Sequence, residues 1–127
     1  MLRDTAQRRV IRRVFQEAGR PLTTHELHML AKQKHPNLGI ATVYRTVKLL
    51  TGQAWLRHVD IPNGPTCYEV ASEQRHHYFQ CDSCAKVFDT VCLERNMSSI
   101  LPEGFVLDRH ELFLYGTCAE CAGPAEA

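Results

Sequence analysis

Two Cys-x-x-Cys pairs are the residues of this 127-residue chain whose types and spacing point most directly to chemistry. They join Cys81 with Cys84 and Cys118 with Cys121, and residues 85–117 separate them. Thiolates are the soft, anionic ligands that zinc prefers, and two residues between the cysteines let one tight turn direct both sulfurs at one ion. The spacing therefore predicts a closed four-cysteine zinc site, which stabilises the fold and leaves no open position for a reaction.

Other chemistry of these cysteines stays open as an alternative. Cys81 and Cys84 could act as a dithiol, which would make the chain a thiol oxidoreductase, or the pairs could form disulfides. Zinc is the preferred interpretation because each pair supplies half of the tetrahedron that the other needs. A zinc-containing interaction module is a third interpretation. We find no convincing nucleophile–base pair for a hydrolase or a transferase, so the chain is predicted not to be an enzyme.

Charge divides the chain into two unlike halves, although the net charge is only +1. Residues 1–62 contain eleven Lys and Arg against four Asp and Glu, whereas residues 63–127 contain four against ten. This asymmetry indicates a basic half that binds nucleic acid and an acidic half with another task. The N-terminus is charged and lacks the apolar region of a signal peptide, and no apolar stretch approaches a membrane span, so we expect a cytoplasmic protein without membrane contact.

The basic half is predicted to contain helices over residues 5–17, from the Thr23 cap to about Lys34, and over residues 40–50. Gly19 and Pro21 separate the first two helices, and Thr23 with Glu26 has the form of a capping box. The expected core residues are Val10, Ile11, Val14, Phe15, Leu27, Leu30, Ala31, Ile40, Val43, Val47 and Leu50. Residues 55–61 and 66–70 flank an Asn-Gly turn, which predicts a hairpin.

Three helices followed by a hairpin form a winged helix-turn-helix, whose third helix enters the major groove of double-stranded DNA. Arg45 could then form a forked contact with a guanine edge, and Tyr44 could pack on a thymine methyl group. Thr42 and Lys48 flank them on the same helix. The phosphate contacts that give salt-dependent affinity are assigned to the first helix, at Arg8, Arg9, Arg12 and Arg13.

The acidic half is predicted to contain strands over residues 77–81, 87–90 and 105–115, with a short helix over residues 93–101. The end of the last strand is apolar on both faces, which implies cover by a second subunit and hence a homodimer that reads a palindromic operator. The fold class is therefore α+β. A winged-helix domain (residues 1–70) is followed by a hinge (71–75) and a small α/β dimerisation and metal-sensing domain (76–127) with the four-cysteine zinc site.

Four segments of the chain resemble signatures of the ferric uptake regulator family. Residues 38–47 (LGIATVYRTV) look like its recognition helix, and residues 76–84 (HHYFQCDSC) resemble its histidine-rich strand. Residues 110–121 (HELFLYGTCAEC) resemble its C-terminal signature, and residues 5–8 (TAQR) the start of its first helix. The resemblance implies a dimeric, metal-responsive transcriptional repressor that controls metal homeostasis.

The resemblance also implies a second, regulatory metal at the hinge. Glu69, His76 and Asp89 match ligand positions of that site, and such ligands suit Fe²⁺, Mn²⁺ or Zn²⁺; Fe²⁺ or Zn²⁺ is the preferred expectation. Two ligand positions depart from the family, because Tyr78 and Pro21 stand where histidines are common. Metal at the hinge is expected to fix the two DNA-binding modules at the spacing of the operator half-sites.

Further candidate ligands follow from the same resemblance. His77, His110 and Glu94 match another metal site of the family. Zinc-sensing members have a cysteine near the place of Cys67 and a histidine or aspartate near that of His58. A zinc site of His58, Cys67, His76 and Asp89 is one interpretation, and the other is that Cys67 is a buried apolar residue and His58 faces phosphate. A peroxide-sensing repressor of the same family remains the alternative function.

Overall fold

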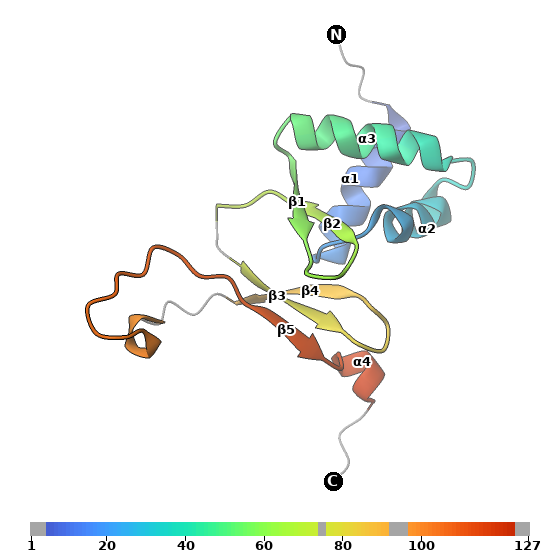
Figure 1. The fold of residues 1–127 in the computed structure, drawn as a ribbon. Helices are drawn as coiled ribbons and strands as arrows, with labels where there is room; N and C mark the ends of the chain where they lie inside the picture. The colour runs from blue at the N-terminus through green and yellow to red at the C-terminus, as the bar shows by residue number, and fades with distance from the viewer. Residues whose placement is uncertain (1–4, 74–75, 92–96, 124–127) are drawn as a thin grey trace.

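The computed structural model describes residues 5–73, 76–91 and 97–123, and Figure 1 shows a helical module stacked above a small sheet. The helical module contains α1 (Ala6–Ala18), α2 (Thr24–Lys34) and α3 (Ile40–Gly52). The hairpin β1 (Leu56–Asp60) and β2 (Thr66–Val70) follows. The sheet contains β3 (His76–Cys81), β4 (Val87–Val91) and β5 (Phe113–Gly116), with a 3₁₀ turn at Met97–Ile100 and the short α4 (Ala119–Ala122). The α+β class with an N-terminal winged helix is thus confirmed.

Side-chain caps and a glycine set the ends of the first two helices. The Thr5 hydroxyl accepts a hydrogen bond from the Arg8 amide, and Gly19 ends α1 in the left-handed region at φ 61°. Thr23 and Glu26 form the predicted capping box, in which each side chain accepts a hydrogen bond from the other residue's backbone amide. Caps of this kind satisfy amides that have no partner within the helix, so the sequence fixes where α2 begins.

The helical core contains all but one of the predicted residues, together with Leu22, Leu38 and Leu56, which were not predicted. Ile11, Val14, Phe15, Leu27, Ala31, Val43, Val47 and Leu50 are all buried, and Val10 and Leu30 are partly buried against them. Ile40 was predicted to be buried, but it is 40% exposed. It is the first residue of α3, where Leu38 fills the adjacent core space and His28 Nε2 lies 2.9 Å from the Leu38 carbonyl.

The wing is an antiparallel hairpin in which Arg57 faces Glu69, His58 faces Tyr68 and Val59 faces Cys67. Its turn closes from the Gly64 amide to the Ile61 carbonyl, with Asn63 at φ 57°. A further bridge pairs Leu22 with Tyr68 through two backbone hydrogen bonds of 2.9 and 2.8 Å. The loop between α1 and α2 is therefore fastened to the wing as a short third strand.

The C-terminal sheet has the strand order β4-β3-β5, with β3 antiparallel to β4 and parallel to β5. Strands β3 and β4 appear close to the predicted positions. The strand predicted over residues 105–115 is wrong for residues 105–112, because only Phe113–Gly116 pairs with β3. The predicted helix over residues 93–101 is a 3₁₀ turn at Met97–Ile100, and its residues 93–96 lie outside the described part of the chain.

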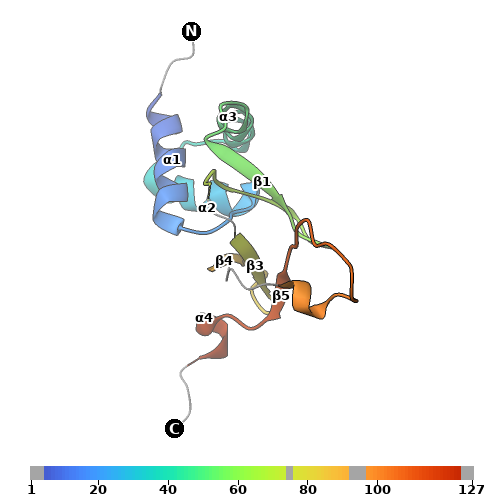
Figure 2. The ribbon, with the colours of Figure 1, turned by 90° about the vertical axis from the view of Figure 1, so that its left-hand side faces the viewer.

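A second core joins the wing to this sheet. Val59, Ile61 and Cys67 from the wing are buried together with Val87 of β4, and Tyr78 and Phe113 pack against them. Figure 2 shows the wing strand β1 descending toward β3 and β5. The two predicted domains are thus in direct apolar contact in this structure.

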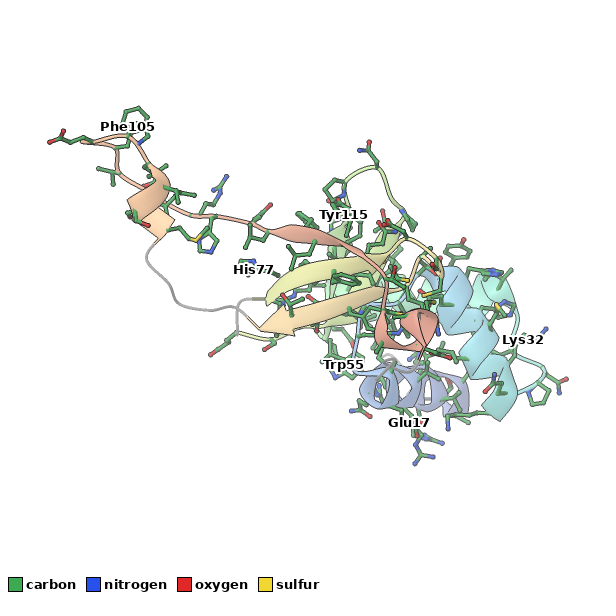
Figure 3. The ribbon with its side chains drawn as sticks, turned by 90° about the horizontal axis from the view of Figure 1, so that it is seen from below. Glu17, Lys32, Trp55, His77, Phe105 and Tyr115 are labelled. Atoms are coloured by element: carbon green, nitrogen blue, oxygen red, sulfur yellow. The ribbon has the colours of Figure 1, made fainter. Side chains whose placement is uncertain are left out.

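One segment projects away from the rest of the molecule. Residues 97–112 form a loop to one side of the sheet, and Phe105 lies at its tip (Figure 3). This part of the chain is apolar and exposed, and Val106 is 85% exposed. The exposed apolar residues here and on β5 are Ile100, Phe105, Val106, Leu112, Leu114 and Tyr115. None of the helices formed by the described residues has the length and apolar character of a membrane span.

Candidate metal centres and DNA-binding surface

The four predicted zinc ligands lie together at one end of the sheet. The sulfurs of Cys81, Cys84, Cys118 and Cys121 all lie within 4.8 Å of one another. Cys81 ends β3, and Cys118 caps α4, which the sequence did not predict. A hydrogen bond of 2.7 Å from the Asp82 amide to the Gly116 carbonyl holds the two turns side by side. Four sulfurs from two such turns fit a tetrahedral zinc ion.

The backbone around the cluster favours thiolates. The amides of Cys118 and Cys84 donate to Cys81 Sγ at 3.3 and 3.5 Å, and these hydrogen bonds lower the pKa of the Cys81 thiol to about 6. Ala85 closes the first turn at φ 64°, a left-handed conformation that is uncommon for a residue with a side chain. The turn is fixed by hydrogen bonds from the Ala85 amide to the Cys81 carbonyl and from the Cys81 amide to the Lys86 carbonyl.

Glu69 is buried where the wing meets the sheet, and its carboxylate already has two partners. Arg57 Nε donates to Glu69 Oε1 over 2.7 Å, and the Tyr78 hydroxyl donates to the same oxygen over 2.5 Å. The side chain of Tyr78 stacks on Phe113 with ring centroids 5.9 Å apart. Burial and the hydrogen bond to Glu69 raise the pKa of Tyr78, so its hydroxyl remains a donor at neutral pH.

Asp89 is the second carboxylate of this cluster, because it faces Tyr78 across β3 and β4. Its Oδ1 is buried and has no hydrogen-bond partner. Burial, followed by its hydrogen bond with Glu69 and the charge of Glu69, raises the pKa of Asp89 to about 7. Protonation of Asp89 reduces its repulsion from Glu69.

Asp89 is expected to make stability depend on pH. A carboxyl whose pKa rises from 3.8 to about 7 on folding binds more protons in the folded state, so its contribution is complete below pH 3.8 and is lost as the pH rises toward 7. Urea unfolding at about pH 5 and about pH 7 should show the free energy of unfolding falling with pH, and Asp89→Asn should remove that part of the slope. The exposed Asp60→Asn is the control, and an equal slope in Asp89→Asn and the parent would contradict the assignment.

Four of the predicted histidine ligands line one pocket. His58, His76, His77 and His110 lie around a cavity of about 480 Å³ whose walls come from β1, Glu73, the start of β3 and residues near His110. The rings of His77 and His110 are 5.1 Å apart between centroids, and His77 Nδ1 is buried without a hydrogen-bond partner. His76 and His77 are adjacent in the strand and point to opposite faces, so His77 and His110 are the closer pair.

The set of His58, Cys67, His76 and Asp89 is not assembled in this structure. Cys67 faces Val59 in the second core, whereas His58 faces Tyr68 on the other side of the hairpin. Burial raises the pKa of the Cys67 thiol to about 11, as expected for a buried apolar cysteine. Among the residues that the structure describes, only the four-cysteine cluster brings three or more such ligand atoms together. Glu94 lies outside the described residues.

The predicted DNA contacts lie mainly on α3. Tyr44 is 57% exposed, Arg45 and Lys48 are exposed, and Arg45 Nη2 donates to Thr42 Oγ1 over 3.2 Å. His58 and Tyr68 of the wing line a shallow groove together with Tyr44 and Lys48 of α3. On α1, Arg9 and Arg12 line a shallow depression with Arg13, while Arg8 is partly buried. This arrangement places a polar helix face and a wing on one exposed side of the helical module.

Comparison with known proteins identifies the family. The model of the ferric uptake regulator family matches residues 1–115. The chain belongs to this family. Members of this family are dimeric, DNA-binding regulators, and the chain is a metal-responsive transcription regulator.

Relatives and solved structures agree with this assignment. The ferric uptake regulation protein of Campylobacter jejuni is 34% identical over 125 residues, which cover 94% of this chain and 80% of that protein. A structure described as a zinc-bound manganese uptake regulator is 30% identical, with a TM-score of 0.80 over 93% of this chain and 92% of that one. The ferric uptake regulator of Helicobacter pylori, described as having three functional metal binding sites, shares the fold at 23% identity, with a TM-score of 0.69 over 98% of this chain and 85% of that one.

Two residues of the Glu69 cluster were not predicted as site residues. Arg57 was not singled out in the sequence, and Tyr78 was noted only as a departure from the family. Arg20 was also missed: it pairs with Glu26 over 2.6 Å and lies 5.5 Å from the centre of the Phe88 ring. The signal for Arg57 was an opposite charge on the facing strand, which becomes visible only once the register of the hairpin is known.

Proposed function

We propose that this regulator is a repressor whose DNA binding responds to Fe²⁺ or Zn²⁺ in the hinge pocket of His76, His77 and His110. The pair of imidazoles at His77 and His110 carries the proposal, because the buried Nδ1 of His77 lacks a partner and a metal ion would provide one. Imidazole donors suit iron and zinc, whereas manganese prefers carboxylate and carbonyl oxygens.

The position of the pocket supports a link between metal and DNA. Its walls include Arg57 and Asp60 of the wing, Glu73 of the hinge and Phe113 at the start of β5. An ion bound in this pocket would favour the arrangement in which the wing faces the sheet. Any ligand that binds this arrangement more tightly than an open one raises DNA affinity by the same factor that DNA raises the affinity for the ligand.

The remaining parts of the proposal assign a role to each module. The four cysteines would hold a structural Zn²⁺, which supplies a cross-link between the two turns. The exposed apolar residues of β5 and of residues 97–112 would pack on a second copy of the chain. The two α3 helices of the dimer would then read a palindromic operator, with residues 71–75 as the hinge between the modules.

Removing one imidazole tests the metal pocket. With DNA selected from random duplexes by the metal-loaded parent, His110→Ala is expected to need about 10–100-fold more metal for half-maximal binding. Titrations with Fe²⁺, Zn²⁺ and Mn²⁺ should follow DNA binding by fluorescence anisotropy, and metal analysis should show that the four-cysteine zinc is retained.

His25→Ala is the matched control, because His25 is exposed on α2 and does not line the pocket. It should titrate like the parent. If the parent binds the selected DNA equally well with and without added metal, the chain is not a metal-dependent repressor through this pocket. A response to Mn²⁺ at concentrations far below those of the other two ions would contradict the preference for Fe²⁺ or Zn²⁺.

A further inference from the structure

The surroundings of Glu69 do not fit a divalent metal ion, although Glu69 and Asp89 match ligand positions of the family's hinge site. Glu69 Oε1 accepts hydrogen bonds from Arg57 Nε and from the Tyr78 hydroxyl. The Arg57 guanidinium lies where a metal would need to approach, and the Tyr78 phenol stands where family members commonly have an imidazole. A metal at this carboxylate would have to displace a cation from a group that is 3% exposed.

We propose that the Arg57 guanidinium is the resident cation at Glu69, in place of a divalent metal, and that the Glu69 it holds joins the wing to the sheet through Tyr78. The contact set spans several elements: Arg57 lies on β1, Glu69 on β2 and Tyr78 on β3. Arg57 Nη1 also donates to the Ser72 carbonyl over 2.8 Å, at the start of the hinge. The Arg57 side chain thus makes directional contacts with the facing strand of the wing and with the hinge, and the Tyr78 hydroxyl connects the same carboxylate to the sheet.

Charge accounting supports this assignment. Arg57 supplies one positive charge 2.7 Å from the Glu69 carboxylate. A divalent ion that approached this carboxylate would be opposed by repulsion from the guanidinium. The hinge pocket with His77 and His110 adjoins this cluster, because Arg57 and Tyr78 line it, whereas neither Glu69 nor Asp89 does.

A second arginine fastens the same two modules at another point. Arg20 Nη2 pairs with Glu26 of α2 over 2.6 Å, while Nη1 lies 3.4 Å from the Val87 carbonyl of β4. Its guanidinium also lies over the ring of Phe88, 5.5 Å from the centroid. Arg20 directly precedes Pro21, where family members commonly have a histidine ligand. The two departures from the family's ligand pattern thus lie beside arginines: Pro21 follows Arg20, and Tyr78 shares the Glu69 carboxylate with Arg57.

The consequence is a joint that is closed without a metal at Glu69. Regulatory metal then acts only through the imidazole pocket, and the carboxylates contribute fixed structure. This inference stands on the contacts of Arg57, Glu69 and Tyr78 and holds whether or not the imidazole pocket is the regulatory site. Its test is accordingly a count of bound metal together with a measurement of stability.

Metal counting is done on the chain of residues 1–127 with its cysteine-bound zinc in place. Equilibrium dialysis with Mn²⁺ and with Zn²⁺ should give the same number of additional ions for Glu69→Gln as for the parent, with no more than about a twofold change in Kd. Arg57→Gln removes the cation beside Glu69 and Asp89. The affinity of these two carboxylates for an added ion should therefore be at least about tenfold higher in this variant than in the parent. Loss of one bound ion in Glu69→Gln would overturn the proposal.

Thermal unfolding supplies a measurement that needs no metal. Arg57→Gln and Glu69→Gln should each lower Tm, and the double variant should lose less than the sum of the two shifts, because the groups interact directly. Arg13→Gln, on the exposed face of α1, is the matched arginine control and should leave Tm close to that of the parent. Additive shifts for Arg57 and Glu69 would overturn the assignment.

Tyr78→Phe keeps the inference testable if a charge variant fails to fold. The phenylalanine preserves the ring that stacks on Phe113 and removes only the hydroxyl that donates to Glu69. It should lower Tm without changing the number of bound ions, and loss of an ion would contradict the proposal. His110→Ala separates the two hypotheses: if it has no effect on metal response while Glu69→Gln still binds all ions, the pocket proposal fails and the Arg57 joint stands.

Discussion

Replacing Cys81 with serine is expected to release the structural zinc and to unfold the C-terminal sheet, with loss of the dimer. Binding of structural zinc contributes about 10–16 kcal/mol in small zinc domains, which matches or exceeds the whole stability of a typical domain, about 5–15 kcal/mol. Cys81 holds a central position, because its sulfur accepts hydrogen bonds from the amides of Cys84 and Cys118. Metal analysis, circular dichroism and sedimentation equilibrium on the purified variant would measure zinc, folding and dimer together.

Cys67→Ala is the matched control for this experiment. Cys67 is also a buried cysteine, but it lies in the second core and outside the zinc cluster. Its replacement should cost roughly 1–2 kcal/mol of stability, as for other small truncations in a core, and leave one zinc per chain. A Cys81→Ser protein that retains one tightly bound zinc and a dimer would show that the cluster is not a four-cysteine zinc site.

The second large effect is expected on DNA recognition. Arg45→Ala should weaken binding to the selected operator by about 1–3 kcal/mol and change binding to random DNA little, since a forked contact to a guanine edge is specific to sequence. Arg45 is exposed on α3, and its hydrogen bond to Thr42 already orients the guanidinium along the outer face of the helix. Fluorescence anisotropy with operator and random duplexes at one salt concentration measures both affinities.

Arg45→Lys separates charge from geometry in the same assay. Lysine keeps the positive charge but lacks the planar fork, so this variant should retain affinity for random DNA and lose most of the preference for the operator. Equal losses on both duplexes for Arg45→Ala would instead make Arg45 a phosphate contact.

The helical module was the part of the fold that sequence predicts best, because its signals are local. The capping box of Thr23 and Glu26, the left-handed Gly19 and the helical spacing of apolar residues each act within a few residues of the chain. The prediction that Ile40 is buried was wrong, because helical spacing does not reveal that Leu38, just before α3, fills the adjacent core space. The strand predicted over residues 105–112 was wrong because, among the residues that the structure describes, these apolar side chains have no pairing strand.

The candidate sites also divide into one that local spacing predicts and one that depends on pairing between distant segments. The cysteine cluster follows from spacing alone, because each Cys-x-x-Cys pair determines its own turn and the structure brings the two turns together. The Glu69 cluster depends on the register of the wing. A two-residue Asn-Gly turn would have placed Arg57 opposite Val70, whereas the observed hairpin places it opposite Glu69. A shift of one residue reverses which face a side chain occupies, so this ion pair was beyond the reach of the sequence.

The second core has a consequence for folding autonomy. Val59, Ile61 and Cys67 belong to the winged helix by sequence, yet they are buried by Val87, Tyr78 and Phe113 of the sheet. A fragment cut at the hinge would place this apolar face of its wing in water, where it favours aggregation. The apolar surface that Val59, Ile61 and Cys67 share with the sheet therefore couples the stability of the wing to that of the acidic half.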